Sequence, residues 1–94
     1  PSALGLHPSG QFVYCADRSG DALHWFELDP ELDRLLPRGS LALGFGARPR
    51  AIDVSSDGRF LALACAGDDS LRLVALEPLS GAPAEVLRVP VGSD

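Results

Sequence analysis

The sequence contains no methionine, no lysine and only two cysteines, and none of its apolar runs is long. Because the 94 residues begin at Pro1 and include no methionine, we expect them to be part of a longer protein. Any targeting signal would then lie outside them. No apolar run approaches the roughly 18 residues that a membrane helix needs, and no signal-peptide pattern opens the chain. We therefore expect no membrane as a partner.

The charge pattern argues against nucleic acid as a partner. All eight basic residues are arginines, and the thirteen acidic residues give a net charge of −5 and an isoelectric point near 4.8. Binding to nucleic acid requires clustered cations that displace counterions from the phosphates. Here the charged residues are spread along the chain, which is typical of a solvated surface.

The two cysteines, Cys15 and Cys65, lie far apart in the sequence, with no C-x-x-C motif and no neighbouring histidine. This spacing does not match a metal site, so we predict no metal and interpret both residues as buried free thiols. Free thiols are compatible with a reducing compartment, and we expect the protein to be cytoplasmic.

An internal repeat with an offset of 48 residues is the strongest signal in the sequence. It aligns residues 1–30 with residues 49–78 without a gap, and most of the differences exchange similar side chains. The identical positions are Pro1/Pro49, Ala3/Ala51, Gly10/Gly58, Phe12/Phe60, Ala16/Ala64, Asp21/Asp69, Leu23/Leu71, Leu28/Leu76 and Pro30/Pro78.

Each repeat is predicted to form four short strands separated by glycine, proline, serine and aspartate turns. The expected strands cover residues 3–7, 12–16, 23–28 and 40–43, then 51–55, 60–65, 71–76 and 86–91. No segment keeps helical spacing for three turns, so the fold class is all-β. Four strands in a repeat of just under fifty residues are typical of one β-propeller blade. We therefore predict two consecutive four-stranded antiparallel blades, residues 1–46 and 47–94.

A propeller blade buries both of its faces only against neighbouring blades. Two blades alone leave two apolar faces uncovered, and two repeats are fewer than the roughly three that a stable array needs. We therefore expect further blades, outside these 94 residues, as partners of this pair.

Three segments carry a resemblance to a known family. They are residues 49–64 (PRAIDVSSDGRFLALA), residues 7–18 (HPSGQFVYCADR) and the acidic segment 29–35 (DPELDRL). Together they resemble the lactonase family of seven-bladed β-propellers, which includes bacterial 6-phosphogluconolactonases. The resemblance implies a seven-bladed ring, no cofactor, and a hydrolase of carbohydrate metabolism that opens a sugar lactone such as 6-phosphogluconolactone.

The candidate catalytic residues are Arg18, Arg50 and Asp17. Strand direction places the loop after each second strand and the loop before each first strand at the same end of the blades. A phosphorylated lactone needs guanidinium donors for its phosphate, and its hydrolysis needs an activated water and a donor to the oxyanion. Arg18 and Arg50 are the predicted donors, and Asp17 would orient an arginine or polarise water. Two alternatives stay open, a solvated turn pair for Asp17 and Arg18 and a bridge between blades for Arg50.

The second repeat departs from the family pattern at three positions. Ala51 stands where the family commonly has histidine, and Cys65-Ala66 stands where it has asparagine followed by glutamine or glutamate. Loss of these polar groups favours a second hypothesis, in which the propeller is a non-catalytic platform for interaction or assembly.

Overall fold

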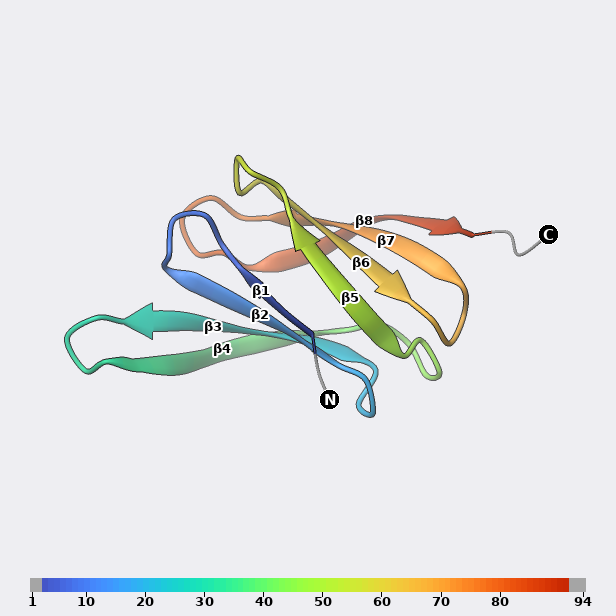
Figure 1. The fold of residues 1–94 in the computed structure, drawn as a ribbon, viewed down its shortest axis with the longest axis horizontal. Coiled ribbons are helices and arrows are strands. Elements are labelled where there is room, and N and C mark those ends of the chain that lie inside the picture. Colours follow the sequence, from blue (N-terminus) through green and yellow to red (C-terminus); the bar gives the residue numbers. More distant parts are fainter. Residues whose placement is uncertain (1–2, 92–94) are drawn as a thin grey trace.

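The computed structural model describes residues 3–91, and these form two four-stranded antiparallel sheets (Figure 1). The first sheet contains β1 (Ala3–Leu6), β2 (Phe12–Asp17), β3 (Ala22–Asp29) and β4 (Arg34–Ala42). The second contains β5 (Pro49–Val54), β6 (Phe60–Cys65), β7 (Ser70–Leu76) and β8 (Pro83–Pro90). In each sheet the strands lie side by side in chain order, which confirms the predicted pair of antiparallel blades. Within the described range, no helix is long and apolar enough to cross a membrane.

The turns repeat with the same offset as the sequence. Gly10 and Gly58 close the turns that follow β1 and β5, with φ of 77° and 72°. Glycine suits these positions because it adopts positive φ without a steric penalty. Asp21 and Asp69, which precede β3 and β7, both have a φ of 51°. The 48-residue offset is therefore a repeat of backbone conformation as well as of residue type.

The fourth strand of each blade begins earlier than the sequence predicted. β4 starts at Arg34 instead of residue 40, and β8 starts at Pro83 instead of residue 86. Both strands contain a β-bulge, in which one residue is left unpaired. The pairing with β3 or β7 continues beyond the bulge, so each strand reaches the earlier residues. The bulges lie opposite Trp25/Phe26 and opposite Leu73/Val74, which are equivalent positions in the two repeats.

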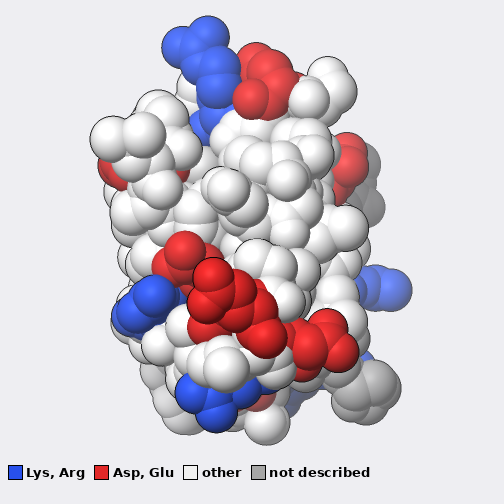
Figure 2. Space-filling model, turned by 90° about the vertical axis from the view of Figure 1, so that its left-hand side faces the viewer, with Lys and Arg blue, Asp and Glu red and all other residues white. Residues whose placement is uncertain are grey.

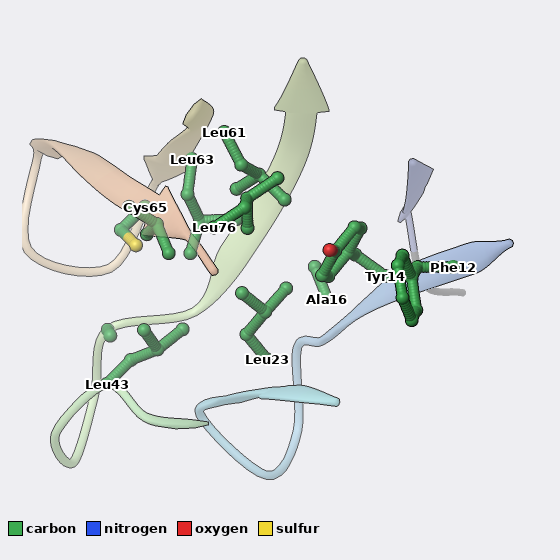
Figure 3. Close-up of a cluster of buried hydrophobic side chains, with 11 residues drawn as sticks. Phe12, Tyr14, Ala16, Leu23, Leu43, Leu61, Leu63, Cys65 and Leu76 are labelled. Atoms are coloured by element: carbon green, nitrogen blue, oxygen red, sulfur yellow. The ribbon is translucent and has the colours of Figure 1, made fainter. Parts of the chain in front are cut away.

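The core lies between the two sheets. From β2, Phe12, Tyr14 and Ala16 point toward the second sheet, where Leu61 and Leu63 of β6 meet them (Figure 3). Alternate residues of β2 and of β6 are therefore buried, as expected when one face of a sheet packs against a neighbouring sheet. On the opposite face of β2, Cys15 is only half-buried in these two blades, so the prediction of two buried thiols is confirmed for Cys65 alone.

The two innermost strands, β1 and β5, pack closely against each other, and β4 and β8 form the outer edges (Figure 1). A Cβ atom added to Gly5 of β1 would lie 2.6 Å from Cγ2 of Ile52 in β5. The packing of these strands therefore requires glycine at position 5.

Polar contacts fix the position of one blade against the other. The Tyr14 hydroxyl donates to the main-chain oxygen of Gly81 at 2.8 Å, and its burial raises the pKa of Tyr14 to about 12. Nε2 of His7 donates to the main-chain oxygen of Gly58 at 3.0 Å, and its Nδ1 accepts from the Ser9 amide at 3.1 Å. His7 therefore has a structural role between the blades.

Candidate functional site

The two predicted arginines lie at the same end of the molecule. Arg18 lies in the turn after β2, and Arg50 is the second residue of β5. We call this the upper end; it comprises the β2–β3 and β6–β7 turns and the connector 43–48 between β4 and β5. The opposite, lower end comprises the β1–β2, β3–β4, β5–β6 and β7–β8 turns. The expected blade boundary, between residues 46 and 47, lies in this connector.

The carboxylate of Asp17 closes its own turn. It accepts hydrogen bonds from the Gly20 amide at 3.0 Å and the Ser19 hydroxyl at 3.2 Å, and Nε2 of His24 lies 3.1 Å from its second oxygen. The amide of Gly20, followed by the contact with His24, lowers the pKa of Asp17. Asp17 is therefore ionised at neutral pH. Among residues 3–91 its hydrogen-bond partners do not include Arg18.

Arg18 lines a hollow of about 310 Å³ between the β2–β3 turn and the connector. The other lining residues are Ser19, Asp21, Phe45, Gly46 and Arg48. Asp21 fixes the connector at this hollow. Its two carboxylate oxygens accept hydrogen bonds from the amides of Gly46 and Arg48, each at 2.8 Å. These backbone hydrogen bonds, that of Arg48 first, lower the pKa of Asp21.

Arg50 lines a different hollow, of about 200 Å³, at the ends of β6 and β8. Its side chain is exposed, and its neighbours there are mostly small or apolar; they are Ala64, Cys65, Ala66, Asp69, Ser70 and Val91. Burial raises the pKa of the Cys65 thiol, which keeps it neutral in this place. The structure thus puts Arg18 and Arg50 at one end but in separate hollows.

Arg72, which lies near the start of β7 and so toward the upper end, is buried between the blades. It is 1% exposed, and its Nη1 donates to the main-chain oxygen of Leu43 at 2.6 Å and to Glu85 at 3.0 Å. Its Nη2 donates to Asp68. Arg72 therefore links β7 to the first blade and is not available to a ligand. Within the described residues, no group of three His, Cys, Asp or Glu side chains could hold a metal ion.

The two ends differ in charge. The turns of the lower end and the strand residues that flank them carry five acidic residues and two arginines, and acidic side chains gather on this side of the surface in Figure 2. The acidic residues are Asp29, Glu31, Asp33, Asp57 and Glu77. The upper end presents Arg18, Arg48 and Arg50, all exposed, and none of them is in an ion pair within residues 3–91. The same end also holds the carboxylates of Asp17, Asp21, Asp68 and Asp69, so it is less acidic than the lower end but not basic.

Arg48, which strand direction places at this end, was not among the candidate catalytic residues, and Phe45 was not predicted to be part of the site. Both lie in the connector, between the predicted strands 40–43 and 51–55, where no strand pattern marked them. The repeat gave no signal for them either, because the aligned segments stop before this connector. The two arginines that flank Pro49 were both expected at this end, and only Arg50 was predicted to be catalytic.

The fold and the comparisons define the class of protein. Two four-stranded antiparallel sheets packed about a shared inner edge are two blades of a β-propeller. Residues 1–93 match the model of the family described as "Lactonase, 7-bladed beta-propeller". The chain belongs to this family.

Solved structures of bacterial proteins share the fold. A candidate 6-phosphogluconolactonase from Bacteroides uniformis aligns with 97% of the chain at a TM-score of 0.87 and 15% identity. The periplasmic gluconolactonase of Pseudomonas aeruginosa aligns with 94% of it at a TM-score of 0.79 and 29% identity. The chain spans about a quarter of each, 26% in both cases. A comparison with curated proteins found no match.

Proposed function

We propose that the chain forms two blades of a lactonase-type propeller that hydrolyses a sugar lactone, with 6-phosphogluconolactone as the substrate. The observation that carries this proposal is the match of residues 1–93 to the lactonase family. The likeness to the gluconolactonase of P. aeruginosa supports the hydrolysis of a sugar lactone, because 29% identity is the highest value among the similar structures described above.

In the proposed reaction, water attacks the carbonyl carbon of the lactone and the bond from that carbon to the ring oxygen breaks. The ring oxygen gains a proton, and the product is a sugar acid. Negative charge develops on the carbonyl oxygen in the transition state, so a positioned cation lowers the barrier. We assign Arg18 and Arg50 as donors to the anionic groups and Asp17, which is ionised, as the group that polarises water.

The remaining blades of the ring are the proposed partners of this pair. Large apolar side chains are exposed on the innermost and outermost strands, such as Leu4 at 70% and Leu87 at 52%. Contiguous apolar surface of this kind is normally covered by another element or partner. We also propose a cytoplasmic location, since Cys15 and Cys65 are free thiols.

The test is kinetic and uses the protein expressed with its native flanking sequence. Arg50→Ala should raise the Michaelis constant for 6-phosphogluconolactone about tenfold or more, because a charge-assisted hydrogen bond contributes roughly 1.5–3 kcal/mol. Arg50→Lys should recover part of the loss, because lysine keeps the charge without the planar guanidinium. Arg34→Ala, at the acidic lower end, is the matched control and should leave the constant unchanged. An unchanged constant in Arg50→Ala would assign this residue a structural role.

A second candidate function is a non-catalytic platform for interaction or assembly. The observation that favours it is the composition of the Arg50 hollow, where Ala64, Cys65 and Ala66 leave Asp69 as the one carboxylate among the lining residues. Absence of lactone hydrolysis in the protein with its native flanking sequence would favour this platform over the enzyme.

A further inference from the structure

The hollow between the β2–β3 turn and the connector has a rigid frame. Asp21 holds both ends of the segment 46–48 through the amides of Gly46 and Arg48. Arg48 itself has a φ of 49°, in the left-handed region that non-glycine residues seldom adopt. A backbone of this kind persists only where the surrounding contacts over-determine it. The backbone of Arg48 is therefore fixed before any ligand binds.

The hollow contains two arginines and one carboxylate, that of Asp21, whose charge interacts with Arg48. Both oxygens of Asp21 are engaged by backbone amides, so they point at the connector. Neither Arg18 nor Arg48 is in an ion pair among residues 3–91. Two guanidinium groups are therefore available at one hollow, and planar guanidinium groups bind oxyanions through paired hydrogen bonds.

Phe45 adds an apolar wall to the same hollow. It is fully exposed, at 105%, and it lies between Gly44 and Gly46, whose φ values are 96° and 84°. Nothing in the described part of the chain covers its ring. The apolar face of a sugar ring could pack against it, and a volume of about 310 Å³ is at the small end of ordinary ligand pockets.

The repeat provides an internal control for these residues. Asp21 and its counterpart Asp69 have the same φ, and the main-chain oxygen of each accepts a hydrogen bond from a residue that follows the fourth strand. This main-chain contact is therefore the same in both blades, whereas the counterpart of the segment 46–48 lies outside the described residues. Arg18, however, corresponds to Ala66, and Phe45 corresponds by sequence to Ser93. The shared main-chain contact therefore requires neither the arginine nor the aromatic ring.

We propose that this hollow binds the phosphoryl group of a phosphorylated sugar, with Arg18 and Arg48 holding the phosphate and Phe45 packing against the sugar ring. The proposal rests on the proposed function for the identity of the sugar, and it adds Arg48 and Phe45 as binding residues. Both lie in the connector, so the subsite lies where the two blades join.

The test is a binding measurement by calorimetry, without turnover, on the protein expressed with its native flanking sequence. The three probes are 6-phosphogluconate, gluconate and inorganic phosphate. We expect 6-phosphogluconate to bind at least tenfold more tightly than the other two. Arg48→Ala should weaken it about tenfold or more, and Arg48→Lys should weaken it less. Phe45→Ala should weaken 6-phosphogluconate and leave the binding of inorganic phosphate unchanged.

Arg34→Ala, at the lower end, is the control and should bind 6-phosphogluconate as the wild type does. Circular dichroism of each variant shows whether it is folded. Equal affinity for gluconate would overturn the phosphate assignment, and equal affinity for inorganic phosphate would overturn the sugar assignment. Unchanged binding in a folded Arg48→Ala variant would overturn the site. Binding that persists without lactone hydrolysis would refute the proposed function and leave this inference standing.

Discussion

Replacing Gly5 with alanine tests the packing of the two innermost strands. The added Cβ would lie 2.6 Å from Cγ2 of Ile52 and 3.0 Å from Cγ2 of Val54. Both are branched side chains, which have few alternative rotamers. Overpacking of this kind typically costs about 1–3 kcal/mol. The backbone of Gly5 is not in the left-handed region, so alanine should recover about 0.5–1 kcal/mol through the lower entropy of its unfolded chain.

The net effect of Gly5→Ala should be a loss of about 1–2 kcal/mol in the free energy of unfolding. The midpoint of thermal unfolding of the protein expressed with its native flanking sequence should fall accordingly. The assay is thermal and urea unfolding followed by circular dichroism, at one protein concentration for all variants.

The double variant Gly5→Ala with Ile52→Ala identifies the cause, since it removes the closest contact. In the Ile52→Ala background, Gly5→Ala should be neutral or stabilising, because the new methyl group occupies space that the isoleucine has left. The difference between the two backgrounds is the coupling energy of the pair. Equal effects of Gly5→Ala in both backgrounds would refute the packing of β1 against β5.

Three further predictions concern the contacts between blades. Tyr14→Phe should lower the free energy of unfolding by about 1–3 kcal/mol, because it leaves the buried Gly81 carbonyl without a donor, and an unchanged urea midpoint would contradict this. Arg72→Ala should lower the free energy of unfolding by about 3 kcal/mol in the same assay. Arg72→Met should lower it less, because methionine keeps the packing of the aliphatic part of the arginine side chain. Equal losses in the two variants would contradict a contribution from this packing. The pKa of Asp21 is lowered in the folded state, so its contribution is complete above the unfolded pKa near 3.9 and is lost as pH falls through the folded value. Stability should therefore decline below about pH 4, and a decline of the same size in Asp21→Asn would show that another group causes it.

The strand pattern of the fold could be predicted because the repeat and the turns were visible in the sequence. Strand β6, for example, spans Phe60–Cys65 as predicted. The early start of β4 was not predictable in the same way, because Pro37 and Gly39 are poor strand formers. They are accommodated by a bulge at the edge of the sheet, and a bulge depends on the pairing with β3, which only the structure reveals.

The site was predicted less completely than the fold. Strand direction predicted that Arg18 and Arg50 lie at the same end of the blades. Sequence alone could not show that they line two separate hollows. The burial of Arg72 could not be predicted, because it depends on contacts with Leu43 and Glu85 that come from distant parts of the chain. The hollow around Arg48 is formed by the connector, whose path depends on Asp21, 27 residues earlier.

The most direct test of the central claim is the rate of 6-phosphogluconolactone hydrolysis by the protein expressed with its native flanking sequence. Acid release is followed in weakly buffered solution and compared with the spontaneous opening of the lactone in the same buffer. The account predicts that the protein accelerates the reaction, that Arg50→Ala raises the Michaelis constant, and that Arg34→Ala does not. A rate equal to that of the buffer alone, with folded protein, would contradict the assignment as a lactonase.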